Sequence, residues 1–259
     1  LIPGQVAGQA QGRGEPTSVI DTVVDNTGLV PDRPTVRPTR TDTPPEIDGR
    51  LDDEVWKTAA VLTEFVQASP LDGAPATEAT EVYVAYDAEN LYFGFYAHYE
   101  DPSIMRANRV DRDRAMMDDL MTVYFDTFMD QQNGYDFDVN AYGVQGDGII
   151  SGGPSGGGGR FGGRGGGGSF GGGSGRIPFA DRSWNALFET GGQIVEDGYT
   201  AEMAIPFKSL RYPQRGGDAP HRWGFQITRS IGGKDETIVW SPTPRAIRGF
   251  LPQMGLLDG

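Results

Sequence analysis

The sequence predicts an all-β protein: an antiparallel β-sandwich with an extended N-terminal arm and a glycine-rich loop inserted between two strands. Three observations lead to this. Between residues 80 and 240, apolar and polar residues alternate over short runs, as in strands with one buried face. Turn-forming residues separate the runs, and helical spacing is confined to one short stretch. With 259 residues, of which 10% are aromatic, the chain is long enough to build a sizeable core.

The first part of the chain, residues 1–44, is predicted to be the extended arm. It is rich in Pro, Gly, Thr and Gln and shows no sustained period, which is typical of extended chain with polyproline character. Only residues 18–24 have the pattern of a short strand or docking segment. The sandwich domain is then expected to occupy residues 45–259, interrupted by the insertion at 151–176.

The sandwich domain is predicted to open with a turn at Asp48-Gly49 and a short helix over residues 52–59, with Trp56 as its core anchor. The later runs alternate. In one of them Phe93 and Phe95 fall on one side of the strand, while Tyr96 falls on the other. The predicted strands cover residues 81–87, 90–99, 120–126, 135–140, 184–189, 192–196, 199–205, 223–230 and 236–240.

Charge and composition exclude several classes of function. The net charge is −14, and residues 45–150 alone carry twenty-two acidic and six basic side chains. Such a surface disfavours nucleic acid, because phosphate binding needs clustered Lys and Arg. No run of 18 apolar residues exists, so no membrane-spanning helix is expected. The absence of cysteine excludes disulfides, thiolate metal sites and cysteine nucleophiles.

No catalytic motif is present, and we expect no enzymatic activity. The two histidines, His98 and His221, belong to no recognisable motif, and neither H-E-x-x-H nor G-x-S-x-G occurs. The run from Asp136 to Asn140 begins like a calcium loop but lacks the glycine that should follow. No metal site is therefore predicted, although a structural calcium ion elsewhere in the sandwich is left open.

Several motifs, in order, resemble family 9 carbohydrate-binding modules and their DOMON-like relatives. IDGRLDDEVWKTA resembles the opening of such modules, AYDAENLYFGFYAHYEDP their paired strands and GYTAEMAIPFKSLRY their late hairpin. The run DDLMTVYFDTFMDQQNGYDFDVNAYGVQGD resembles the central strands. The sequence is also similar to the N-terminal module of a bacterial family of unknown function, in which a long outer-membrane-type barrel follows. The resemblance covers roughly residues 44–259 without the insertion, and it implies an exported, periplasmic sandwich. Processing of an exported precursor would explain a first residue Leu1 rather than Met, and so would a sequence that starts late.

The resemblance also implies sugar binding between exposed aromatic side chains, with polar groups hydrogen-bonded to the hydroxyls. The candidate ligand-binding residues are Trp184 and Trp240, which lie at strand ends, together with Asp136, Asp138 and Asn140 on one strand face. The alternative for both tryptophans is core packing, and for the three polar residues a solvated outer face.

The insertion, residues 151–176, contains sixteen glycines and three arginines. Glycine-rich chain loses much conformational entropy on ordering, so we expect the insertion and the arm to become ordered only against partner subunits. The candidate docking residues are Phe161, Phe170, Arg160, Arg164 and Arg176.

The leading expectation is therefore a non-catalytic periplasmic subunit that docks in a membrane-associated complex of several proteins. The overall pattern resembles an accessory subunit of a bacterial photosynthetic reaction-centre–antenna complex. The alternative is a carbohydrate-binding module, free or joined to a barrel. A third reading is the accessory domain of a glycoside hydrolase.

Overall fold

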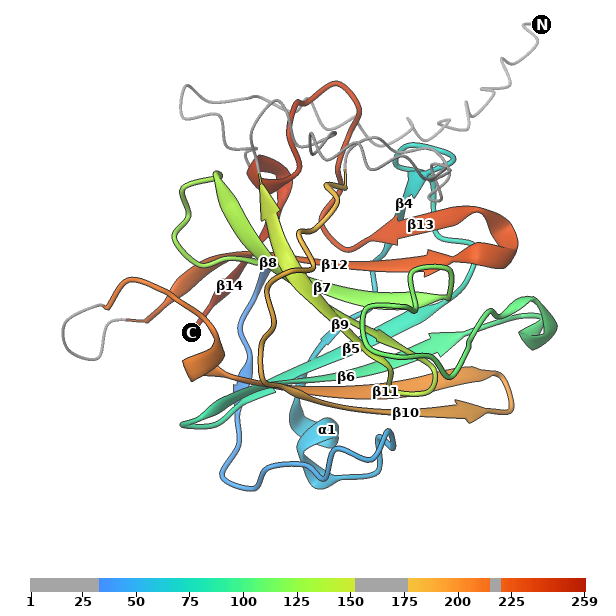
Figure 1. Cartoon of the computed structure of the whole chain (residues 1–259), viewed down its shortest axis with the longest axis horizontal. Helices are drawn as coiled ribbons and strands as arrows, with labels where there is room; N and C mark the ends of the chain where they lie inside the picture. The colour runs from blue at the N-terminus through green and yellow to red at the C-terminus, as the bar shows by residue number, and fades with distance from the viewer. Residues whose placement is uncertain (1–32, 152–176, 215–219) are drawn as a thin grey trace, which may run out of the picture.

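The fold is a sandwich of two β-sheets with one short helix outside it, seen in a computed structural model that describes residues 33–151, 177–214 and 220–259 (Figure 1). One sheet has eight strands and the other six. This confirms the predicted β-sandwich. Most neighbouring strands are antiparallel, but β1–β14 and β2–β5 are parallel pairs, so both sheets are mixed.

The strands are short, and most are joined by turns. Besides the helix α1 (Glu54–Thr58), the described residues form four single 3-10 turns. The strands are β1 (Thr35–Val36), β2 (Thr39–Arg40), β3 (Ala60–Leu62), β4 (Val66–Ser69), β5 (Thr80–Tyr86), β6 (Asn90–His98), β7 (Leu120–Asp126), β8 (Asn133–Asn140), β9 (Gln145–Ser151), β10 (Glu189–Val195), β11 (Gly198–Pro206), β12 (Arg222–Ile231), β13 (Glu236–Val239) and β14 (Gly255–Asp258).

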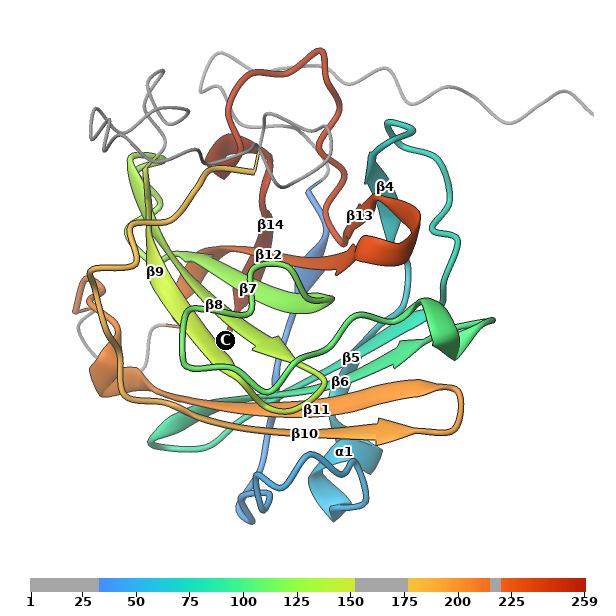
Figure 2. The same cartoon turned by 45° about the vertical axis from the view of Figure 1, so that its right-hand side comes forward.

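Hydrogen bonding defines the order of strands in each sheet. The larger sheet runs β1-β14-β12-β7-β8-β9, with β13 joined to β12 and β4 to β13. The smaller sheet runs β10-β11-β6-β5-β2, with β3 joined to β5. Figure 2 shows α1 on the side of the smaller sheet that faces away from the larger one.

The core lies between the sheets and is dominated by aromatic side chains. Phe93 of β6 packs against Phe125 of β7 and Phe225 of β12, with ring centroids 6.1 and 5.9 Å apart. All three side chains are fully buried. Burial of one such side chain contributes about 1.5–3 kcal/mol. The alternation that predicted these strands therefore identified the core face correctly.

One predicted strand, residues 184–189, is wrong over most of its length, because β10 begins only at Glu189. The alternation of buried and exposed residues in this segment is real, since Ala186 and Phe188 are buried. Its backbone, however, hydrogen-bonds to side chains and not to a neighbouring strand. The Ala186 N–H donates to Asp147 at 2.6 Å, and Arg112 and Gln145 donate to the carbonyls of Ala186 and Phe188 at 2.8 Å. The helix predicted over residues 52–59 is confirmed as α1.

The outer face of the larger sheet is covered by a second layer of chain. Tyr124 and Ile150, which point outward, pack against Phe250, Leu251 and Met254 from the C-terminal part of the chain. Ile177 and Ala180, which follow the insertion, pack on the same cluster. A ligand site on an open sheet face therefore has to be sought on the smaller sheet.

Candidate functional site

A buried carboxylate attaches the opening motif of the sandwich, residues 47–59 (the motif segment), to the smaller sheet. Glu202 of β11 is fully buried on the outer face of that sheet. It accepts hydrogen bonds from the Asp48 and Gly49 backbone N–H groups at 3.0 and 2.7 Å, and from Trp56 Nε1 at 2.8 Å. Burial raises the pKa of Glu202 to about 7, and the three donors oppose that rise.

Close backbone contact at the same place requires glycine. Gly49 has φ +90°, and a Cβ there would lie 2.6 Å from the backbone nitrogen of Gly192 on β10. On β6, a Cβ at Gly94 would meet Leu51 at 2.8 Å and the Trp56 ring at 3.2 Å. The segment containing α1 is thus pressed onto part of the smaller sheet and leaves the rest of its outer face uncovered.

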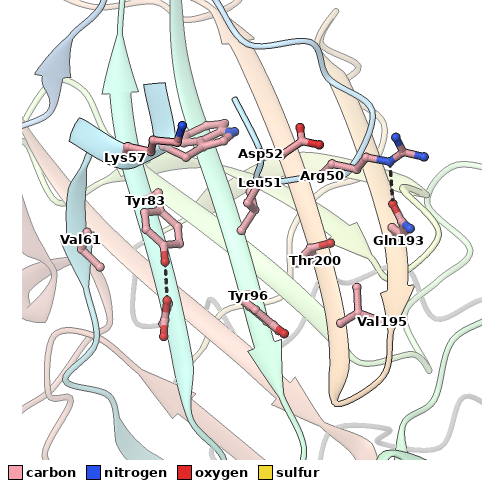
Figure 3. A pocket seen from close by; sticks show the side chains of 12 residues that line it. Arg50, Leu51, Asp52, Lys57, Val61, Tyr83, Tyr96, Gln193, Val195 and Thr200 are labelled. Atoms are coloured by element: carbon pink, nitrogen blue, oxygen red, sulfur yellow. Dashed lines mark hydrogen bonds between the residues drawn. The ribbon is translucent and has the colours of Figure 1, made fainter. Parts of the chain in front are cut away.

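The uncovered part is an open depression of about 710 Å³ (Figure 3). Its floor is a row of residues that face one another across four strands: Glu81 of β5 pairs with Tyr96 of β6, Tyr96 with Thr200 of β11, and Thr200 with Gln193 of β10. The remaining lining residues come from the motif segment, β3, β5 and β10: Arg50, Leu51, Asp52, Trp56, Lys57, Val61, Tyr83 and Val195.

Two half-buried tyrosines supply the aromatic surface of the depression. Tyr83 stands next to the covered Trp56, with ring centroids 6.4 Å apart. The Tyr96 ring stacks on His98 with a centroid separation of 3.8 Å, so only its other face is open to a ligand. In Figure 3 the Tyr83 ring is seen largely face-on and the Tyr96 ring edge-on, so the two form a corner rather than one flat platform.

Carboxylates hold both tyrosines in place. Tyr83 donates its hydroxyl hydrogen bond to Glu81, and Tyr96 donates to Asp197 at 2.6 Å. Burial, followed by the bond to Glu81, raises the pKa of Tyr83 to about 12. The bond to Asp197, followed by burial, raises the pKa of Tyr96 to about 12. Both phenols therefore stay neutral over the physiological pH range.

Groups that can hydrogen-bond a polyol surround these rings. Thr200 donates its hydroxyl to the Gly49 carbonyl at 2.6 Å, which leaves its oxygen as an acceptor. Gln193 accepts a bond from Arg50 at 3.2 Å and keeps its amide N–H groups. Aromatic faces combined with both donors and acceptors suit a neutral, hydroxyl-rich ligand.

The predicted residues Asp136 and Asp138 lie elsewhere, on the covered outer face of the larger sheet. Arg182 bridges them, with Nη2 at 3.0 Å from Asp136 and 2.6 Å from Asp138. Both carboxylates are buried. Burial and the neighbouring Asp138 raise the pKa of Asp136 to about 8. A sugar at this position would have to displace Arg182.

Asn140 is also buried, and its side chain is fully occupied by the protein. Its amide donates to Asp118 at 2.8 Å and to the Asn108 carbonyl at 2.9 Å. Its oxygen accepts the N–H groups of Tyr142 and Val144, both at 2.9 Å. In this geometry Asn140 shapes the β8–β9 turn.

The two predicted tryptophans pack against neighbouring aromatic side chains. Trp240 is buried, with its ring centroid 5.6 Å from that of Phe225. Trp184 is half-buried, 5.0 Å from Tyr135 and 6.0 Å from Phe137. The structure therefore does not bring these tryptophans together with the polar candidates as a clamp. The docking candidates Phe161, Phe170, Arg160, Arg164 and Arg176 lie outside the described residues.

The sequence did carry a signal for the depression. Tyr96 and His98 occupy the outward positions of a strand whose inward positions are all apolar, and an aromatic side chain on the polar side of a strand indicates a surface site. The motif that precedes the site was also visible. What could not be seen was that Tyr83 and Tyr96 flank a face that the rest of the described residues leave open.

Two absences hold for residues 33–151, 177–214 and 220–259. None of the helices there is long and apolar enough to cross a bilayer. Over the same ranges, no cluster of three or more acidic or histidine side chains could hold a metal ion. The sequence leaves a structural calcium ion open, and that point stays untested.

Comparison with known proteins gives one family match and several structural likenesses. A family model described as carbohydrate family 9 binding domain-like matches residues 47–241. A family 9 carbohydrate-binding module from Caldicellulosiruptor kristjanssonii, solved with cellotriose, has a TM-score of 0.53 at 14% identity, covering 87% of this chain and 93% of that chain. The same kind of module solved with glucose gives 0.53 at 14% identity, with 87% and 95% covered.

A third structure, a candidate carbohydrate-binding protein from Bacteroides uniformis, has a TM-score of 0.58 at 12% identity and covers 88% of this chain and 99% of that chain. No curated protein matches the sequence. These findings overturn the leading expectation. The reaction-centre subunit is wrong, and the family match and the sugar-bound neighbours favour the alternative, a carbohydrate-binding module.

Proposed function

This chain belongs to the carbohydrate family 9 binding domain-like family, and on that premise we propose that it is a non-catalytic module that binds sugar in the depression on its smaller sheet. The proposal has two parts: the activity, which is sugar binding, and the place, which is the depression on the smaller sheet. The family match supports the activity. The place rests on the geometry of the described residues.

One observation supports the proposed location of the sugar site. The rings of Tyr83 and Tyr96 form a corner, and hydrogen-bonding groups surround it. A pyranose ring has apolar C–H faces and a rim of hydroxyls. Stacking on a tyrosine buries a C–H face, and the rim then lies within reach of Glu81, Thr200 and Gln193. Over the described ranges, the outer face of the larger sheet offers no comparable surface, because a second layer of chain covers it.

The structural neighbours suggest the first sugars to test. Two of them were solved with cellotriose and with glucose, so β-1,4-linked glucose oligomers are the first candidates. Both phenols are neutral at physiological pH and the lining holds acidic and basic groups, which favours a neutral sugar over a strongly charged one.

Isothermal titration calorimetry with glucose, xylose, mannose and chitin oligomers tests the proposal. We expect binding by at least one of them, weakened about tenfold or more by Tyr83→Ala and by Tyr96→Ala, since a lost aromatic contact costs about 1.4 kcal/mol or more. Phe179→Ala is the matched control, because Phe179 is 75% exposed and does not line the depression. The place is wrong if a bound sugar is unaffected by both tyrosine variants, and the activity is wrong if none of the oligomers binds.

A further inference from the structure

The depression extends across the smaller sheet from one edge to the other. On one side it reaches Val61 of β3, which hydrogen-bonds only to β5 in the described part of the chain and so forms an edge. On the other side it reaches Gln193 and Val195 of β10, the opposite edge strand. Figure 3 shows Val61 and Gln193 at opposite sides of the opening, with the tyrosines between them.

The length of the depression follows from the strand spacing. Five strands, β3, β5, β6, β11 and β10, contribute to it, and neighbouring strands lie about 4.8 Å apart, so it extends over roughly 19 Å. One pyranose residue of an extended chain is about as long as one strand spacing. The depression can therefore accommodate several linked sugars side by side, far more than a monosaccharide needs.

Among the residues that the structure describes, none closes either end of the depression. Val61 is 50% exposed, and Gln193 at the opposite edge is exposed as well. The segment that carries Leu51 and Trp56 forms a side wall along the length, since it covers the sheet over Gly94. A site that recognises a chain end needs a wall across one end, whereas a side wall with two open ends lets a chain continue past the protein in both directions.

The floor also repeats at the strand spacing. Glu81, Tyr96, Thr200 and Gln193 are paired across consecutive strands, so each strand presents one polar or aromatic side chain in the same row. A polymer with one set of hydroxyls per sugar would meet one such group per residue. From the open ends and this repeat, we infer that the depression binds an internal stretch of a neutral polysaccharide, laid across the strands, rather than a single sugar or a chain end.

This inference rests on the proposed function. The dependence of affinity on the length of the sugar oligomer tests the inference separately from sugar binding itself. The probes are glucose, cellotriose and cellohexaose, with cellohexaose tested both with its reducing end free and after borohydride reduction, titrated into the full chain by calorimetry. We expect cellohexaose to bind at least about tenfold more tightly than glucose, which corresponds to about 1.4 kcal/mol from the added residues. Reduction of the end of cellohexaose should change its affinity by less than about twofold.

Variants at the two ends test the direction of the chain. Val61→Asp and Gln193→Ala should each weaken cellohexaose severalfold, and by a larger factor than they weaken any glucose binding, with Phe179→Ala as the control. The inference is overturned if glucose binds as tightly as cellohexaose, if reduction of the end abolishes binding, or if neither end variant affects cellohexaose. If another sugar of the calorimetric panel binds instead of glucose oligomers, the same comparison is made with its monomer and hexamer. If none of the glucose, xylose, mannose or chitin oligomers binds, it is the proposed sugar binding by this site that fails.

Discussion

Replacement of Glu202 by alanine should be among the most damaging single changes in this domain. The substitution removes the acceptor for three buried donors, the N–H groups of Asp48 and Gly49 and the indole N–H of Trp56. A buried donor left without an acceptor costs about 1–3 kcal/mol. Three such donors predict a loss of at least about 3 kcal/mol from a free energy of unfolding that is typically about 5–15 kcal/mol.

Urea unfolding followed by tryptophan fluorescence measures this loss, with Glu196→Ala in the exposed β10–β11 turn as the control. A double-mutant cycle with Trp56→Phe then isolates one bond. Because Trp56→Phe removes the indole donor that Glu202→Ala would strand, the double variant should be more stable than the sum of the single losses predicts, by about 0.5–3 kcal/mol. A Glu202→Ala loss below about 1 kcal/mol, or strict additivity with Trp56→Phe, refutes the role assigned to Glu202.

The pH dependence adds a second readout for Glu202. Its folded pKa, about 7, lies above the usual 4.5, so between these values the native state holds a proton that the unfolded state has released. The wild-type free energy of unfolding should therefore fall as pH rises from 4.5 to 7, by up to about 1.4 kcal/mol per pH unit from this group. In Glu202→Ala this contribution to the slope should be absent.

Two further predictions concern other close contacts. Gly49→Ala should lower the free energy of unfolding by at least about 3 kcal/mol, because it combines backbone strain at φ +90° with a contact to Gly192; Gly73→Ala, at φ +75° with open space around it, should show only the strain, and equal losses in urea unfolding would contradict the clash. Asp136→Asn should flatten the fall in melting temperature between pH 4 and 8, since the raised pKa makes wild-type stability decrease as pH rises through that range; parallel pH profiles for variant and wild type would show that Asp136 is ionised throughout.

The strands of the sandwich could be predicted because their inward residues alternate with outward ones. β6 shows this clearly: Phe93 and Phe95 are buried in the core, and the sequence identified that face. The shortest strands were harder to find. β3 and β14 contain three and four residues, and nothing in so short a run distinguishes it from a loop. Residues 184–189 were misread because alternation reports burial and cannot show whether the partner is a strand or a set of side chains.

The site was harder to predict than the fold, because a period of two identifies two faces of a strand without saying which is open. Asp136 and Asp138 alternate with apolar residues, which is typical of a solvated face. The chain nevertheless brings Arg182, more than forty residues later in the sequence, over both of them. Conversely, the outward Tyr96 is open to a ligand. Leu51 and Trp56 of the motif segment cover β6 at Gly94, two residues before Tyr96, and leave Tyr96 uncovered.

The short parallel strands β1 and β2 have a consequence for self-association. Three residues after β1 adds to the edge of the larger sheet at β14, the chain reaches β5 and adds β2 to the edge of the smaller sheet. A single stretch of extended chain thus occupies hydrogen-bonding positions on one edge of each sheet. Bare edges of this kind recruit strands from other molecules. A chain cut at residue 45 would expose β14 and β5 at once. Strands β1 and β2 therefore occupy edge positions at which another copy of the protein could otherwise pair.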